Sequence, residues 1–180
     1  MEQVKNIGGI GSILLLAGVV PTIGQVLVFA GFIMLIIAVY KLSEITGQKE
    51  IFHNYLIGII LNSALLLVLI FGIGAAVLFS FSLQTGLAGL GMGIILAILL
   101  LWIISIVSAY FVKKSFEKIS QATGVATFRT VGKLYFIGSI LHVILIGWII
   151  SLVAAAMQIA AFFSLPSAPP EKPQEPDLKS

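Results

Sequence analysis

Three long stretches of this chain are dominated by apolar residues and contain no Asp, Glu, Lys or Arg. They cover Asn6–Tyr40, Asn54–Val112 and Leu134–Pro170. A helix that spans a bilayer needs about 20 apolar residues, so each stretch is long enough to cross a membrane at least once. Because lipid cannot hydrogen-bond to open backbone groups, the stretches are expected to be helical. The pattern predicts an all-α, polytopic transmembrane helix bundle.

Turn-forming residues divide these stretches into five predicted spans. Pro21 and Gly24 are predicted to fold the first stretch into a hairpin, because one continuous helix would be about 51 Å long. The glycine-rich segment 81–93 is the next predicted turn. The last run is too long for one straight crossing and must tilt, protrude or break, with Gly147 as the preferred break point. The spans are predicted near residues 7–20, 23–40, 55–79, 94–112 and 134–163, within a bundle of residues 1–165.

The first predicted span is short, and the sequence leaves open whether it crosses the membrane or is re-entrant. At the other end of the chain, residues 166–180 contain five of the six prolines together with charged residues. This composition is typical of an extended, disordered segment, so we expect a disordered Pro-rich tail.

One sequence pattern occurs twice in the polar linkers. Ser-x-x-Thr-Gly stands at Ser43–Gly47 and again at Ser120–Gly124. Each copy is followed by Tyr-x-Ile-Gly-x-Ile-Leu, at Tyr55–Leu61 and Tyr135–Leu141. We interpret the pattern as a parallel internal repeat of two helix hairpins, with both glycines ending the helices before them. The hairpins of Ile23–Phe79 and Ile94–Phe163 should then superpose by rotation about the membrane normal.

The basic residues indicate how the spans are oriented. Eight of the ten fall on one side of the predicted bundle, namely Lys5, Lys41, Lys49, Lys113, Lys114, Lys118, Arg129 and Lys133. The four tyrosines lie at the same helix ends, as in an interfacial aromatic belt: Tyr40, Tyr55, Tyr110 and Tyr135. The positive-inside rule places this side in the cytoplasm. We therefore expect a multi-pass protein of the cell membrane with its N-terminus in the cytoplasm and, after five spans, its C-terminus outside.

Composition excludes several classes of protein. Only 9% of the residues are charged, against about 25% in soluble domains, so a water-soluble fold is excluded. The net charge of +3 is interpreted as a signal of topology, and no nucleic-acid partner is expected. The chain has no cysteine, so disulfides, thiolate chemistry and Cys-based metal sites are absent.

Several short motifs resemble one family. They are KxxGGIGSIL from Lys5, AVYKLS from Ala38, EIF from Glu50, SFEKIS from Ser115 and AFFSLP from Ala161. Together they resemble a set of small, mainly archaeal multi-pass membrane proteins catalogued as domain of unknown function 996. The resemblance covers nearly everything but the tail and implies a membrane protein. It implies no substrate, cofactor or catalytic residue.

Few residues in the predicted spans can carry chemistry. No pair of carboxylates lies within a span, and two histidines without cysteine cannot build a structural zinc site. No catalytic, cofactor or metal residues are predicted, and the protein is expected not to be an enzyme. Asn62 and His142 match in the repeat register and are predicted to hydrogen-bond each other or a shared water in the bundle interior, for packing or along a solute path. Gly147, Ser151 and Ala155 recur at four-residue spacing and predict a helix-packing face.

Two function classes remain after these exclusions. The first is a non-enzymatic membrane component, such as an assembly factor or subunit. The alternative is a small-solute transporter or channel, acting as a homo-oligomer. The expected partners are the lipid bilayer and either further copies of the chain or a membrane protein. The basic linker residues act as the topology determinant in this interpretation, and binding of anionic lipid or a cytosolic partner is the alternative.

Overall fold

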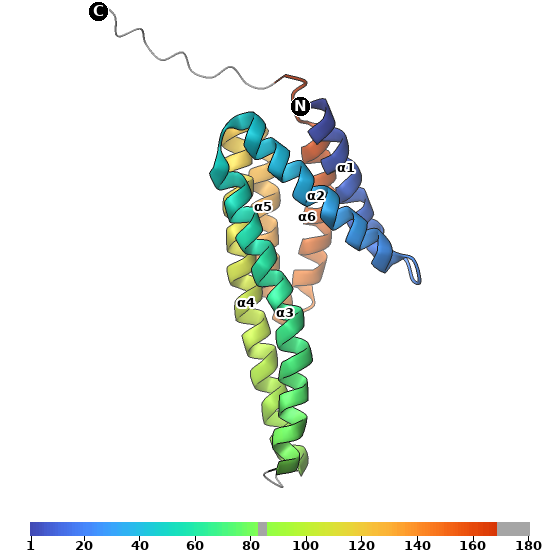
Figure 1. Cartoon of the computed structure of the whole chain (residues 1–180), viewed down its shortest axis with the longest axis vertical. Helices are drawn as coiled ribbons and strands as arrows, with labels where there is room; N and C mark the ends of the chain where they lie inside the picture. Colours follow the sequence, from blue (N-terminus) through green and yellow to red (C-terminus); the bar gives the residue numbers. More distant parts are fainter. Residues whose placement is uncertain (83–85, 169–180) are drawn as a thin grey trace, which may run out of the picture.

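The computed structural model describes residues 1–82 and 86–168 of the chain, and these residues form six α-helices (Figure 1). The helices are α1 Glu2–Leu16, α2 Gly24–Thr46, α3 Lys49–Ser82, α4 Gly86–Thr123, α5 Ala126–Ile140 and α6 Ile146–Phe163. Two short 3₁₀ helices, η1 Ala17–Val19 and η2 Leu141–Val143, follow α1 and α5. The prediction of an all-helical fold is confirmed for the described part of the chain.

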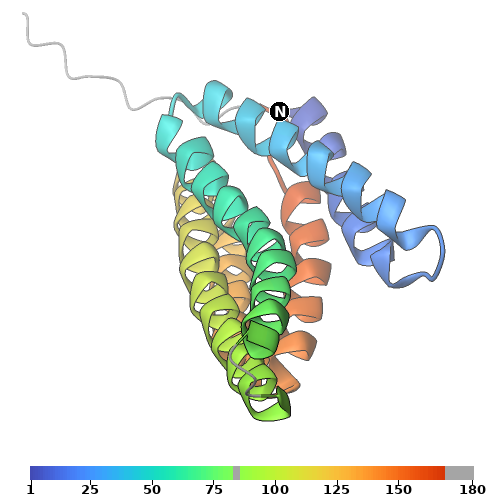
Figure 2. The same cartoon turned by 60° about the horizontal axis from the view of Figure 1, so that its bottom comes forward.

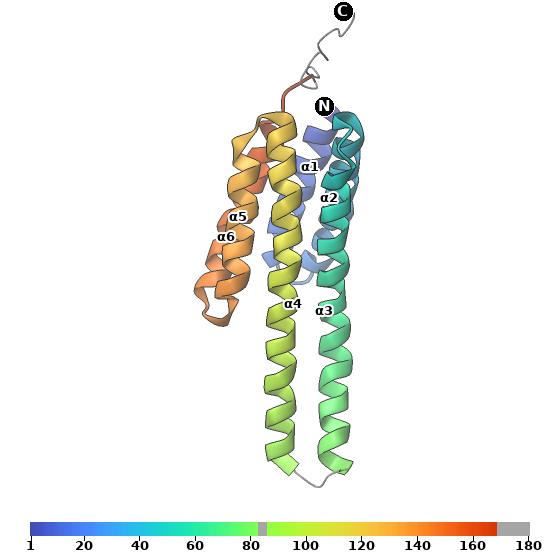
Figure 3. The same cartoon turned by 90° about the vertical axis from the view of Figure 1, so that its left-hand side faces the viewer.

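The six helices pair as three antiparallel hairpins of unequal length. The α3–α4 hairpin has helices of 34 and 38 residues, about 51 and 57 Å long. The first helices of the other two hairpins, α1 and α5, have 15 residues each, about 22 Å. Figure 3 shows α3 and α4 extending well beyond the turn between α5 and α6. Figure 2 shows the α1–α2 hairpin leaning away from the other helices.

All three hairpins meet at one end of the molecule, here called the polar end. It contains the α2–α3 and α4–α5 linkers, the start of α1 and the end of α6 (Figure 1). Each helix there packs against the next in chain order, and α6 packs against α1. The helices therefore close into a ring around the polar end, while the far half of the α3–α4 hairpin projects beyond it.

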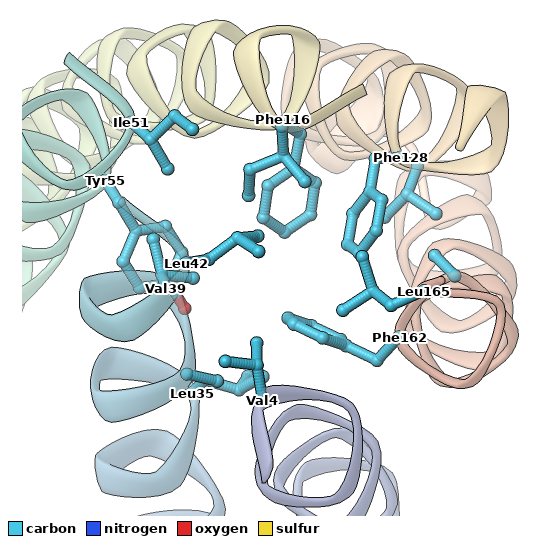
Figure 4. Packing of buried hydrophobic residues seen from close by; sticks show 14 residues of the cluster. Val4, Leu35, Val39, Leu42, Ile51, Tyr55, Phe116, Phe128, Phe162 and Leu165 are labelled. Atoms are coloured by element: carbon cyan, nitrogen blue, oxygen red, sulfur yellow. The ribbon is translucent and has the colours of Figure 1, made fainter. Parts of the chain in front are cut away.

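The ring encloses a hydrophobic core drawn from all six helices (Figure 4). Phe116 of α4 stacks on Tyr55 of α3 with ring centroids 6.2 Å apart, and meets Phe128 of α5 edge-on at 5.8 Å. Phe128 in turn meets Phe162 of α6 edge-on at 5.1 Å. Burying a side chain of this size contributes about 1.5–3 kcal/mol. The helix ends that carry the charged linkers are thus held together by aromatic packing.

The predicted stops at Gly47 and Gly124 are confirmed. Both residues have positive φ, 69° and 75°, a conformation that glycine adopts without steric cost. The threonine before each glycine donates its hydroxyl back to the helix, Thr46 to the Leu42 carbonyl and Thr123 to the Ile119 carbonyl. Both copies of Ser-x-x-Thr-Gly therefore end a helix in the same way.

The predicted fifth span breaks in two, which is one of the three outcomes expected for a run of this length. Residues 134–163 contain the end of α5, η2 and α6, and the two helices fold back on each other. The break falls at residues 141–145, and Gly147 is the second residue of α6. The glycines at 138 and 147 explain the fold-back. A Cβ built on Gly147 would lie within 2.4 Å of the Gly138 carbonyl oxygen, so only glycine permits this approach.

Other boundaries differ from the prediction at the helix ends. The first helix is separate from the second, as predicted, and the chain turns between them at Pro21. The predicted turn at 81–93 is much shorter, because α3 runs to Ser82 and α4 begins at Gly86. Its residues 83–85 lie outside the described residues, as does most of the predicted tail, residues 169–180.

Neither the five spans nor the hairpin repeat is confirmed. Within the described residues, three helical segments are long and apolar enough to cross a membrane: Gly24–Thr46, Ile94–Thr123 and Ile146–Phe163. The proposed repeat units also differ, because α3 is one continuous helix whereas the matching segment breaks between α5 and α6. The likeness that the structure does show lies in the two linkers.

Candidate functional site

Several polar groups lie at the break between α5 and α6, in the apolar part of the molecule. At the end of α5, the last carbonyl groups have no partner within the helix. Trp102 of α4 supplies a partner for two of them. Its indole nitrogen donates to the carbonyl oxygens of Ser139 and Ile140, at 3.2 and 3.1 Å. The side chain of a neighbouring hairpin thereby satisfies the helix end.

His142 lies within the break and contacts α6. Its Nε2 is 3.2 Å from the Ser151 hydroxyl oxygen, and its ring lies 5.4 Å from the Trp148 ring. The predicted partner, Asn62, is an exposed residue of α3, and the bonds found for the described residues include none between Asn62 and His142. The structure therefore brings together two of the predicted residues, His142 and Ser151, in a pairing that the sequence did not indicate.

The predicted small-residue face lies along α6. Gly147 and Ser151 both face α5, because a Cβ on Gly138 would lie 2.6 Å from the Ser151 oxygen and 3.1 Å from the Gly147 carbonyl oxygen. Ala155 follows one turn later and is half-buried. The His142–Ser151 contact lies beside this close approach of the two helices, which fits a role in helix packing.

A second buried polar contact joins the first and last hairpins, and the sequence analysis missed it. The Gln158 amide donates to the Ser12 hydroxyl at 3.0 Å, and Ser12 donates to the Gly8 carbonyl at 2.8 Å. Gln158 is only 3% exposed. The signal available in the sequence was a lone glutamine in an otherwise apolar run, but its partner lies 146 residues away.

The polar end carries two open hollows with charged linings. The larger, about 540 Å³, lies between α3 and α4 and contains two glutamates, two lysines and His53. The Lys118 ammonium lies 2.7 Å from the Glu50 carboxylate and holds the pKa of Glu50 below its ordinary value. The charges in this hollow therefore balance. Among the described residues, no group of three or more His, Cys, Asp or Glu side chains is placed to hold a metal ion.

Comparison with known proteins agrees with the sequence motifs. A family model described as "Protein of unknown function (DUF996)" matches residues 27–156. The chain belongs to this family. The uncharacterized protein MJ1644 of Methanocaldococcus jannaschii is 38% identical over 168 residues, which cover 92% of this chain and 93% of that protein. No solved structure matches. The family resemblance inferred from the motifs is thus confirmed. The apolar helices of the chain are compatible with a membrane protein.

Proposed function

We propose that the chain is a non-enzymatic integral membrane protein whose polar end lies at the cytoplasmic face. The observation that carries the proposal is the separation of charge from apolar surface along α4. Its apolar side chains are exposed from Ile94 to Val107, which would be costly in water. Its lysines begin at Lys113, beside the linkers. A bilayer around the exposed segment would cover the apolar surface and leave the lysines in the cytoplasm.

The α3–α4 and α5–α6 hairpins reach different depths in this arrangement. From Tyr110 at the interface to the first residue of α4, Gly86, the rise is about 36 Å, enough to cross a core of about 30 Å. From Tyr135 to Leu145 at the α5–α6 turn, it is only about 15 Å. Leu145 is apolar and 82% exposed, as expected for a turn inside lipid. The α3–α4 hairpin would therefore cross the membrane, and the α5–α6 hairpin would re-enter from the cytoplasmic face.

The same arrangement changes the expected location of the C-terminus. Val4 and Leu165 belong to one hydrophobic core at the polar end, so the two ends of the helical body lie on the same side. Three hairpins, each entering and leaving through one face, give an even number of passages. We therefore propose that both ends are cytoplasmic, in place of the opposite sides expected from five spans.

The contacts at the helix break favour a structural role over a solute path. The carbonyl groups that a broken helix offers to an ion are bonded to Trp102, and His142 contacts Ser151. A membrane component that assembles with copies of itself or with another membrane protein fits these closed contacts. Transport is the alternative function, and the break is the feature that favours it. Solute flux in proteoliposomes, lost in His142→Leu while the protein stays folded, would support transport.

The topology can be tested with single cysteines, because the chain has none. Cysteines replace the exposed residues Gln48, Gln121 or Ser167 near the polar end, or Thr85 between α3 and α4 in the sequence. An impermeant thiol reagent applied to intact cells should label the cysteine at position 85 alone. After the cells are opened, all four should react.

The position-167 cysteine separates the two topologies. Its labelling in intact cells, together with protection at 48 and 121, would support five spans and contradict the hairpin arrangement. Labelling at 121 would reverse the orientation. Release of the chain from membranes by alkaline carbonate would show that it is not an integral membrane protein.

A further inference from the structure

Four basic residues gather where α4 and α5 leave the apolar part of the molecule. We call Lys113, Lys114, Arg129 and Lys133 the basic cluster. The two helices approach closely here, because a Cβ on Gly132 would lie 3.1 Å from the Lys113 Cα. Arg129 and Lys133 are one helical turn apart and both exposed, so they lie on one face of α5. The cluster is thus assembled from two helices.

Two of these cations lie over the rings of an aromatic pair. The rings of Tyr110 and Phe136 lie 6.2 Å apart. The Lys113 ammonium lies 5.2 Å from the centre of the Phe136 ring, and the Lys114 ammonium 4.9 Å from that of Tyr110. Contacts of this kind attract an ammonium to the ring face, and its N–H groups can still donate to an anion.

The positive charge of the basic cluster is largely uncompensated. Within the described residues, one carboxylate lies within 4 Å of its ammonium groups, that of Glu117 at 3.8 Å from Lys113. This distance is long for an ion pair with a direct hydrogen bond. Lys118, which lies outside the cluster, is paired with Glu50 at 2.7 Å. Lys114 also lines the neighbouring hollow, beside Glu50 and Glu117, but among the described residues Arg129 and Lys133 have no carboxylate within 4 Å. The cluster therefore keeps a net positive charge and favours an anion.

The apolar surface beside the cluster indicates which anion fits. Val107 and Ile103 are exposed on α4, as are Ile137 and Ile140 on α5, one to three turns from the cluster toward the apolar end. An acyl chain could lie against this strip while its phosphate meets the lysines. We propose that the basic cluster binds the headgroup of an anionic phospholipid. The proposal rests on the proposed membrane location, and it adds a specific ligand site to it.

The test compares two double variants of the full-length protein purified in detergent. Lys113→Gln/Lys133→Gln removes two charges from the cluster, and Lys5→Gln/Lys49→Gln removes two elsewhere at the polar end. Phosphatidylglycerol or phosphatidylcholine is titrated into each, and bound lipid is counted by native mass spectrometry. Each basic residue near a membrane surface contributes about fivefold to affinity, so the cluster variant should lose about 30-fold for phosphatidylglycerol. The control should change less than threefold, and Lys113→Arg/Lys133→Arg should retain binding.

Several outcomes would overturn the proposal. Equal losses in the two double variants would mean diffuse surface attraction, and equal binding of the two lipids by the unchanged protein would remove the preference for an anion. Displacement of the lipid by millimolar inorganic phosphate would indicate a soluble anion instead. If the double variant does not fold, Lys114→Gln alone should lose about fivefold. Failure here leaves the carbonate test of membrane insertion unaffected, so the two proposals can fail separately.

Discussion

His142 shows what a single residue in an apolar sequence does and does not reveal. An ionisable side chain in such a run must find a polar partner, and the sequence was sufficient for that expectation. We inferred the partner from the repeat register, which pointed to Asn62. In the structure, the ring of His142 contacts Ser151 instead. The register failed because α5 breaks and folds back, which brings α6 rather than α3 to His142.

Trp102 gives a test of the helix break at this scale. Trp102→Phe keeps the ring but removes the donor to the Ser139 and Ile140 carbonyls. Ser139 is a buried residue, and leaving a buried acceptor without a partner costs about 1–3 kcal/mol, so the free energy of unfolding in detergent should fall by that amount. Trp148→Phe is the control, since Trp148 is largely exposed. Equal losses in both variants would show that the indole bonds contribute nothing.

Gly124 tests the backbone conformation at a linker. Its φ is positive, and a Cβ there would meet nothing within 4 Å, so the cost of Gly124→Ala is conformational alone. We expect a loss of about 1–2 kcal/mol in the free energy of unfolding, and a smaller loss for Gly124→Asn. Chemical denaturation in mixed micelles would measure both. No difference between Ala and Asn would argue against the left-handed conformation.

At the scale of helices, the sequence predicted where a helix ends better than how the chain continues after it. Gly47 and Gly124 follow polar, helix-compatible residues, and their local signal was enough to place both ends correctly. The break before α6 was placed less well: Gly147 was the preferred break point, but the break falls at Leu141–Leu145, which is apolar and contains no proline or glycine. The break depends on the contact between Gly138 and Gly147, which joins different helices and cannot be read from either segment alone.

That contact predicts the effect of a small substitution. Gly147→Ala would place a methyl group within 2.4 Å of backbone atoms of Gly138, Leu141 and His142. Because backbone atoms cannot rotate away, the two helices must separate, and we expect a loss of about 1–3 kcal/mol in thermal unfolding experiments. Gly74→Ala is the matched control, since a Cβ there meets nothing within 4 Å. A stable Gly147→Ala variant would contradict the observed closure of α5 on α6.

For the whole molecule, the sequence predicted the all-helical, apolar class correctly, whereas the number of crossings and the orientation in the membrane stay predictions. Hydropathy measures how apolar a segment is, and a re-entrant hairpin is as apolar as a spanning helix. Distinguishing them requires the contacts between α1 and α6 that hold the first and last hairpins at the polar end. Those contacts include the hydrogen bond from Gln158 to Ser12, two residues that are separated by nearly the whole chain.

Depth in the bilayer is the prediction that belongs to this scale. A nitroxide attached to a cysteine at Leu145 should show high collision rates with oxygen and low rates with a water-soluble nickel chelate, because the proposed arrangement places the turn near the bilayer centre. One attached at Thr85 should show the reverse. High exposure to the chelate at Leu145 would mean that the α5–α6 hairpin crosses the membrane completely or lies outside it.

The unequal lengths of the hairpins have a mechanical consequence. In the proposed arrangement, all six helices contribute to the cross-section of the protein in the leaflet nearer the polar end. In the opposite leaflet, α3 and α4 extend beyond the α5–α6 turn and the cross-section is smaller. Such a wedge spreads one leaflet more than the other, and the bilayer relieves the difference by bending toward the broad end. We therefore expect the protein to concentrate where the membrane bulges into the cytoplasm, and to resist the opposite curvature.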